Sequence, residues 1–383
     1  MAISVKANTI LAHFQNALRG GQRCVAVGND GIIWIAYGHW NNPSDGILVA
    51  YSSDGGLTWT EEVAAAERCF CWDGISLVID SNNVPSIIYS YVPVVGNALI
   101  RYITRTGGVW SAPETVVDMG GALSPWVIKA VIDSTDTIHI VYQRATIRYI
   151  VGTAGAWSPF EVATAAGFFP DLAINNSDEP VVVYIGIGGT EIIYRTGGVW
   201  TAPDIVDVPG GGGGNPIPVI QIDSAGDYHV AWQDEEVPAP WDYYVYYRKK
   251  ESGIWLAKQS LAFDVNEWYV GLGLDDEDNA YVFYQYQGAD EAVYYRKVTT
   301  GTILGAQTVI DAGILRPNGN PSTFSFLYHK YPTNGVLAAA FQPVVVLLDE
   351  AGGFYADVYF YAASALSFTS VPTAGTLPAT EVT

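Results

Sequence analysis

The sequence predicts an all-β protein, a seven-bladed β-propeller made of four-stranded antiparallel blades. The composition favours strands and turns, with 40 Gly, 20 Pro, 25 Tyr and 12 Trp against only 15% charged residues. A short apolar run ending in an aromatic residue recurs seven times along the chain. A turn followed by Trp recurs between these runs. Repetition of this kind is typical of radially arranged sheets.

The aromatic runs include "GIIWIAY", "TIHIVYQ" and "DYHVAWQ", and the sequence predicts that each is the second strand of a blade. Their terminal aromatics are Tyr37, Tyr89, Tyr142, Tyr184, Trp232, Tyr284 and Phe341. Most runs follow an apolar strand and a polar turn such as "LVIDSNN" or "AVIDSTD". Asp and Asn favour such hairpin turns because their side chains bond nearby backbone amides.

After each aromatic come a variable loop, a third strand and a second turn, as in "LIRYITRTGGVW". Five Trp residues occupy one position of this pattern: Trp59, Trp110, Trp157, Trp200 and Trp255. Ile303 takes that position in the sixth copy and Phe368 is the candidate in the seventh. Each unit of about 50 residues therefore predicts four strands that bury their faces on neighbouring units.

The whole chain, 1–383, is predicted to be one domain. The blades are placed at about 21–65, 72–118, 125–165, 169–208, 217–263, 268–311 and 321–371, with 1–20 as ring closure or an N-terminal arm. Because an open edge invites aggregation, we expect Ser4–Phe14 to pair with the last blade around Ala356–Val371. A helix around Ile10–Leu18 is the competing interpretation.

The stretch "SSDGGLTW" combines residues suited to a tight turn: its glycines permit positive φ, and its Asp accepts backbone and Thr58 hydrogen bonds. These residues resemble the Asp-box motif S-x-D-x-G-x-T-W of sialidase-like (BNR-repeat) propellers: Ser52, Asp54, Gly56, Thr58 and Trp59 match it. The later "TGGVW" copies keep the glycines and the Trp without the Asp. In that family the motif lies opposite the active site, so its role here is expected to be structural.

The resemblance implies the parts that a sialidase uses: three arginines for a carboxylate, a Tyr–Glu nucleophile and an Asp acid/base. The early arginine context of the family is absent, and Arg19 and Arg23 do not match it. Five arginines recur in or beside the third strands and are interpreted as a structural register: Arg101, Arg148, Arg195, Arg248 and Arg296. Arg68, Arg144 and Arg316 lie where they could reach the opposite face. We therefore predict no catalytic residues.

Paired carboxylates for glycoside hydrolysis remain an alternative. The candidates near predicted loops are Asp73, Asp171, Asp234, Glu235, Glu236, Glu267 and Asp290. A sialidase-like glycoside hydrolase or a polysaccharide lyase is thus the competing function.

The sequence predicts neither a cofactor nor a metal site. The five His residues lack a metal-binding spacing, and His139 and His229 are expected in the core. The formal charge of −21 excludes nucleic-acid binding, and no apolar run is long enough for a membrane span. The three cysteines are interpreted as free buried thiols.

The loops between second and third strands, and those joining blades, are expected at one end of the channel, where ligands bind. The candidate ligand-binding residues there are Trp40, Asn41, Trp72, Asp73, Trp126, Gln143, Gln233, Asp234, Trp241, Trp268 and Gln285. Trp faces flanked by polar side chains suit sugar recognition, and packing or a protein interface are the alternatives. Gln143, Gln233 and Gln285 either line the mouth of the central channel of the propeller or form hydrogen bonds with backbone amides at strand ends.

The favoured interpretation is a non-enzymatic adhesion, decoration or scaffold protein whose loop face binds a glycan or a protein partner. A sialidase-like propeller normally works outside cells, and Met1–Arg19 does not resemble a secretory signal. A virion component, such as a phage protein that contacts other virion proteins, reconciles these points. The expected location is extracellular or on a virion surface, without a signal peptide.

Overall fold

The structure is a computed structural model. It describes residues 3–6, 12–13, 23–39, 46–69, 74–93, 95–121, 125, 127–208, 217–235, 243–263, 265–274, 277–286, 293–299, 302–311, 324–326, 345–352 and 355–362. Within these ranges all regular structure is β-strand and there is no helix. The protein is all-β, as the composition predicts.

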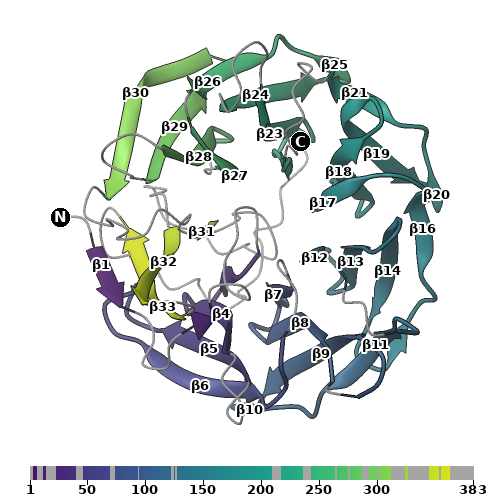
Figure 1. Ribbon diagram of the computed structural model, residues 1–383, viewed down its shortest axis with the longest axis vertical. Coiled ribbons are helices and arrows are strands. Elements are labelled where there is room, and N and C mark those ends of the chain that lie inside the picture. The colour runs from purple at the N-terminus through teal and green to yellow at the C-terminus, as the bar shows by residue number, and fades with distance from the viewer. Residues whose placement is uncertain are drawn as a thin grey trace, which may run out of the picture.

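The described strands form seven antiparallel sheets arranged around a central axis (Figure 1). Sheet 1 contains β3 (Val25–Val27), β4 (Ile33–His39), β5 (Gly46–Ser52) and β6 (Thr60–Ala65). Sheet 2 contains β7 (Ile75–Ile79), β8 (Pro85–Tyr91), β9 (Leu99–Thr106), β10 (Val109–Trp110) and β11 (Glu114–Asp118). Sheet 3 contains β12 (Val127–Ile132), β13 (Ile138–Gln143), β14 (Ile147–Thr153), β15 (Ala156–Trp157) and β16 (Glu161–Thr164).

The remaining sheets repeat this plan. Sheet 4 contains β17 (Phe168–Ile174), β18 (Pro180–Gly186), β19 (Gly189–Thr196), β20 (Val199–Trp200) and β21 (Asp204–Asp207). Sheet 5 contains β22 (Val219–Ile222), β23 (Tyr228–Glu235), β24 (Tyr243–Glu251), β25 (Ile254–Trp255) and β26 (Gln259–Phe263). Sheet 6 contains β27 (Val265–Leu274), β28 (Ala280–Tyr286), β29 (Val293–Thr299) and β30 (Thr302–Asp311). Sheet 7 contains β31 (Phe324–Phe326), β32 (Val345–Gly352), β33 (Tyr355–Ala362), β1 (Ile3–Lys6) and β2 (Ala12–His13).

The fourth strand is interrupted in sheets 2 to 5. In sheet 2, both β10 and β11 pair with β9, one after the other along the same edge. The third strand therefore carries two successive partners, and the short first piece holds the recurring Trp. These sheets are four-stranded units with a broken outer strand.

The N-terminal strands belong to the last sheet. Ile3–Lys6 pairs with Ala362–Tyr359, and Ala12 and His13 pair with Ala356 and Tyr355. Strands from the two ends of the chain thus share one sheet. Ala12 and His13 lie in a strand, so the structure shows no helix at that point of the Ile10–Leu18 segment.

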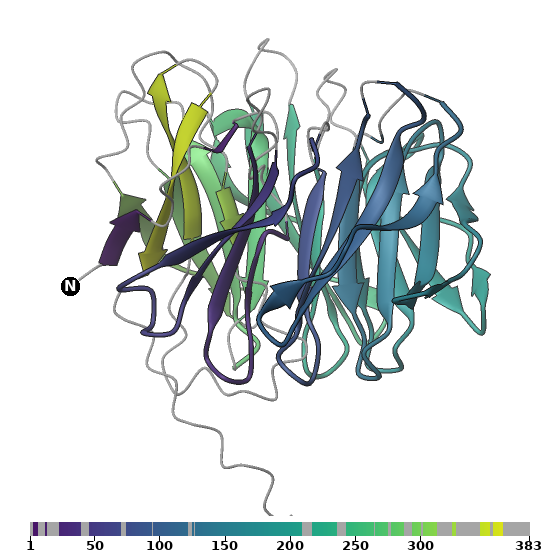
Figure 2. The same ribbon diagram turned by 90° about the horizontal axis from the view of Figure 1, so that it is seen from below.

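Antiparallel order places the connections at two opposite ends of the ring, which Figure 2 shows from the side. The connections between second and third strands, and those from sheet to sheet, lie at one end, which we call the loop end. The hairpin turns between first and second strands and between third and fourth strands lie at the other, the turn end.

The core fills the gaps between sheets. One apolar cluster joins Ile33 and Val49 of sheet 1 to Leu77 and Tyr89 of sheet 2. Further clusters join sheets 2 and 3, 3 and 4, 4 and 5, and 5 and 6. Burying each large apolar side chain contributes about 1.5–3 kcal/mol, and both faces of a sheet are buried only when neighbours flank it. Repetition around the axis is therefore the source of stability.

Candidate functional site

Three of the predicted loop-end residues have described side chains, and all three are buried. Gln143 ends β13, while Gln233 and Asp234 lie near the end of β23. Their exposed fractions are 1%, 4% and 5%. These side chains are therefore enclosed by protein and offer little surface to a ligand.

Gln143 supports the backbone of the next sheet. Its Oε1 accepts a 2.9 Å hydrogen bond from the amide of Phe169 in β17. Phe169 has a φ of 49°, and the β17–β18 pairing shifts register between Phe168 and Asp171. A non-glycine residue at positive φ is strained, and Gln143 helps to hold it. Of the two roles predicted for this Gln, the structure shows the satisfaction of a strand-end amide.

The other predicted loop-end residues have no described side chain. Trp40, Asn41, Trp72, Asp73, Trp126 and Trp241 lie outside the described residues. The backbones of Trp268 and Gln285 lie in β27 and β28. The predicted sugar-binding surface is therefore still a prediction.

A buried ion pair crosses the axis between sheets 1 and 4. Arg23, two residues before β3, places Nη2 3.3 Å from Asp171 Oδ1 and also donates to the carbonyl of Leu172. The two residues are 8% and 1% exposed. Asp171 Oδ2 accepts a 2.9 Å bond from the amide of Ile220 in β22. One carboxylate thus connects three sheets at the axis.

Sequence reasoning named both residues but did not pair them. The sequence context of Arg23 does not match the sialidase arginine, and Asp171 is one of seven candidate carboxylates. No local pattern indicates that residues 148 positions apart meet across a ring. Arg23 and Asp171 meet only because the sheets are arranged in a ring around one axis.

The Asp171 link has counterparts in other sheets. Ser76 in β7 accepts from the Ala130 amide at 2.9 Å, and Cys24 Sγ lies 3.4 Å from the Ile75 carbonyl. First strands of neighbouring sheets are not hydrogen-bonded to each other as a ladder, so these side chains bridge the gap. These axial contacts are therefore structural.

The aromatics that end the second strands are unsuited to nucleophilic catalysis. Tyr37 and Tyr89 are 0% exposed, and their hydroxyls donate to Glu61 and Glu67. Burial, and then the hydrogen-bonded carboxylate, raises the pKa of both phenols well above the usual range. The two phenols therefore stay protonated, and their burial keeps them out of reach of a substrate.

His139 and His229 stand in a repeated buried triad. His139 lies 3.0 Å from Asp133 Oδ2 and 2.6 Å from the Tyr149 hydroxyl. His229 makes the same contacts with Asp223 and Tyr247, at 3.0 and 2.7 Å. In a neutral imidazole, a proton on Nε2 donates to the carboxylate and leaves Nδ1 to accept from the Tyr hydroxyl. Both histidines lie in the core, where the sequence placed them.

The arginines of the third strands do not share one register. Arg101 and Arg148 pair with the aromatics Tyr89 and Tyr142, whereas Arg248 pairs with Val230. Arg296 matches the Arg248 position, and Arg195 lies opposite Trp200. All five therefore lie in third strands, as the sequence predicts, but they occupy three different positions relative to the second strand.

A hydrogen bond between sheets is repeated around the ring: the indole N–H of the Trp in one sheet donates to a carboxylate of the sheet before it. Trp110 Nε1 donates to Glu62 at 2.7 Å and Trp157 to Glu114 at 2.8 Å. Trp200 donates to Glu161 at 3.2 Å and Trp255 to Asp204 at 3.1 Å. A cation opposite the Trp joins three of these pairs: Arg105, Arg195 and Lys250. Sequence reasoning missed this, although an acidic residue recurs in each preceding fourth strand.

The stretch Ser52–Trp59 forms a self-bonded turn at the turn end. Asp54 Oδ1 accepts from the amides of Leu57 and Thr58 at 3.0 and 2.9 Å, and Oδ2 accepts from Thr58 Oγ1 at 2.6 Å. Trp59 Nε1 donates to the Gly56 carbonyl at 3.0 Å. The Thr58 hydroxyl, then its amide, lowers the pKa of Asp54 to about 2. This geometry is a structural clasp.

The described part of the chain shows neither a metal-binding cluster nor a membrane-spanning helix. No cluster of three or more His, Cys, Asp or Glu residues there has the geometry to hold a metal ion. Those residues also include no helix that could cross a membrane.

No family model matches the chain, and no curated protein matches it. Solved structures do. The ulvan lyase of polysaccharide lyase family PL25, bound to -[GlcA(1-4)Rha3S]-, has a TM-score of 0.62 and 10% identity over 94% of this chain and 96% of its own. The polysaccharide lyase Uly1 has a TM-score of 0.59 and 10% identity over 95% and 99%. A sialidase from Trypanosoma rangeli has a TM-score of 0.47 and 11% identity over 94% of this chain and 58% of its own.

The two lyases show that this chain has their fold over nearly its full length. At about 10% identity the likeness concerns the fold alone. Together with the ring of antiparallel sheets, it establishes a propeller-like all-β protein.

Proposed function

We propose that this protein is a carbohydrate-binding propeller whose seven sheets are its seven blades. The observation that supports this most is the full-length similarity of its fold to two polysaccharide lyases, at TM-scores of 0.62 and 0.59. The shared ligand class is an argument by analogy from the shared fold. The proposed ligand is a polysaccharide that lies across the loop end.

The loop end is the proposed binding face because the opposite end is occupied by structural turns. At the turn end, Ser81 donates to Asp136 and Ser134 to Asp178, which ties the turn of one sheet to that of the next. The loop-end connections carry the Trp residues that sequence analysis selected, such as Trp72 and Trp241. Indole faces cover the apolar faces of sugar rings.

We propose a non-enzymatic role because the described titratable groups are engaged in structure. The Tyr hydroxyls of the Tyr–Glu pairs are buried, His139 and His229 are enclosed with Asp and Tyr, and Arg23 is bound to Asp171. Polysaccharide lyase activity is the second candidate, and the two lyase structures favour it directly. Its acid and base would lie in the loop-end connections.

We further propose that the protein works outside the cell or on a virion surface, as a sialidase-like adhesion or decoration module. A polysaccharide ligand is encountered in those places. The clasp at Ser52–Trp59 has the residues of an Asp-box, which supports this family assignment.

Two measurements separate the binding module from the lyase. Calorimetry measures the binding of ulvan and of a neutral polysaccharide. Ultraviolet absorption detects the unsaturated uronate that β-elimination by a lyase leaves. Binding without product supports the binding module, and product identifies a lyase. Trp72→Ala and Trp241→Ala should each weaken binding at least ~10-fold, about 1.4 kcal/mol. Val109→Ser, at an exposed turn-end position, is the control and should bind normally. Failure of every polysaccharide to bind overturns the proposal.

A further inference from the structure

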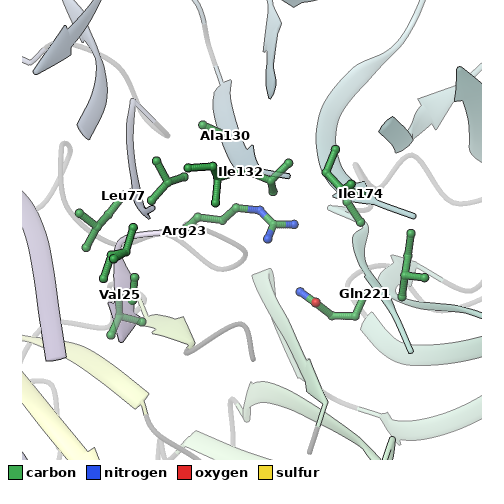
Figure 3. A pocket seen from close by; sticks show the side chains of 13 residues that line it. Arg23, Val25, Leu77, Ala130, Ile132, Ile174 and Gln221 are labelled. Atoms are coloured by element: carbon green, nitrogen blue, oxygen red, sulfur yellow. The ribbon is translucent and has the colours of Figure 1, made fainter. Parts of the chain in front are cut away.

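A cavity lies on the axis, separate from the loop end. Its volume is about 80 Å³, and its walls come from the first strands of sheets 1 to 5 (Figure 3). Those strands run from the loop end to the turn end. Most of the lining is aliphatic, and Arg23 and Gln221 are its polar side chains.

Gln221 is the unusual residue of this lining. It pairs with His229, three residues before Trp232, and the same position in the four preceding sheets is held by Ala26, Val78, Val131 and Ala173. The Gln221 side chain is 5% exposed, and its amide nitrogen has no hydrogen-bond partner among the described residues. Figure 3 shows this amide and the Arg23 guanidinium facing the same space.

Burying an unpaired amide N–H is costly, whereas the aliphatic residues of the other sheets avoid that cost. A Gln at this position is therefore explained best by an acceptor atom inside the cavity.

The surroundings determine the charge of that acceptor. The Arg23 charge is already balanced by Asp171 at 3.3 Å. On the side of the turn end, the cavity is bordered by a collar of Ile79, Ile132, Ile174 and Ile222, which are 2%, 5%, 7% and 5% exposed. An anion would lose its hydration without meeting an unbalanced positive charge, so an uncharged molecule is favoured.

We propose that this axial cavity binds one small uncharged organic molecule through an oxygen acceptor that receives the Gln221 amide. With about 30 Å³ for each water in the liquid, the space corresponds to about three waters, or a ligand of about four heavy atoms. The collar contacts the apolar part of the ligand. The site is independent of the polysaccharide face.

Acetone and acetate provide the test, because they have similar size and differ in charge. Ligand-observed NMR titrations of the full chain should show saturable binding of acetone, with acetate at least ~10-fold weaker. Isobutene, which lacks an acceptor, should also bind at least ~10-fold more weakly than acetone. Equal binding of acetone and acetate overturns the proposal, as does binding of neither.

Variants test the role of the amide itself. Gln221→Val introduces the residue found at this position in sheets 2 and 3, so the fold should tolerate it. It should weaken acetone binding at least ~10-fold. Gln259→Val is the matched control, because Gln259 also has a buried unpartnered amide atom but lies in the outer strand of sheet 5. Unchanged acetone binding in Gln221→Val, or an equal loss in both variants, contradicts the site.

Discussion

The guanidinium of Arg23 lies 3.3 Å from the Asp171 carboxylate, and the pair joins two sheets that are separated by two others around the ring. Asp171 also holds the Ile220 amide of a third sheet. The contact is buried on both sides. Its energetic role follows from that burial, because a charge left alone in the interior is expensive.

Asp171→Ala should lower the free energy of unfolding by about 3 kcal/mol, since it leaves Arg23 buried without its carboxylate. Urea denaturation measures this. The double variant with Arg23→Met should recover part of the loss, because no uncompensated charge remains. A loss for Asp171→Ala below about 0.5 kcal/mol contradicts the proposed role of the pair.

The interface between sheets 5 and 6 lacks the Trp–carboxylate contact. Gln259 replaces the carboxylate, and Ile303 and Val298 replace the Trp and the cation. The Gln259 Oε1 atom is buried without a partner among the described residues. Gln259→Leu should therefore leave the free energy of unfolding unchanged or raise it.

Glu161→Leu is the matched change at an intact contact. Glu161 receives two hydrogen bonds from Arg195, at 2.8 and 3.0 Å, and one from Trp200. Because the carboxylate is 36% exposed, the expected loss is about 1 kcal/mol, also measured by urea denaturation. Equal effects of Glu161→Leu and Gln259→Leu would show that the repeated contact has no special role.

Stability should decrease on mild acidification because of His139. Burial lowers the pKa of its imidazole, despite the opposing effect of Asp133 and Asp178. The unfolded chain binds this proton more tightly, so stability present above about pH 6.5 is lost as the pH falls below that value. Tyr149 and Arg195 complete the surroundings of the ring.

The His139→Gln variant separates this titration from other acid effects. Gln can donate to Asp133 and accept from Tyr149 without titrating. The decrease in unfolding free energy between about pH 7 and pH 5 should be smaller than in the unmodified protein. An identical decrease in both proteins excludes His139 as the cause.

A second loss of stability is expected at lower pH from Asp54. Hydrogen bonds from Thr58 hold the pKa of this carboxyl at about 2. The stabilisation is present above about pH 4, the unfolded value, and disappears as the pH falls toward 2. Asp54→Asn should make the melting temperature, measured by circular dichroism, depend less on pH over that interval. If the melting temperature of Asp54→Asn falls with pH as steeply as that of the unmodified protein, Asp54 does not stabilise the fold through the clasp.

The repeat made most of the fold predictable. Aromatic runs, polar turns and the Trp position indicated antiparallel units, and the strands found in residues 25–311 follow that plan. The pairing of Ser4 and its neighbours with Tyr361 and its neighbours follows from the need to remove an open edge. Local periodicity carries such information because a strand with two buried faces needs apolar residues throughout.

The site was less predictable. Gln143 is predicted on the ligand-binding face, and its hydrogen bond with Phe169 could not be predicted because the sequence does not show which strand ends meet. The arginines lie in third strands as expected, but the sequence does not show that Arg101 and Arg248 stand two positions apart relative to the neighbouring strand. The position of a residue relative to the neighbouring strand depends on how the two strands pair. A shift of two residues in that position does not change the amino-acid composition, so the sequence does not reveal it.

The sequence by itself determined that the chain forms repeated antiparallel sheets with a clasp at Ser52–Trp59, because hydrophobic alternation and turn chemistry act over a few residues. Only the tertiary structure decided that Arg23 meets Asp171 and that Gln221 faces a cavity among aliphatic neighbours. Those contacts arise from closing a ring, which brings residues about 150 and 200 positions apart to one axis.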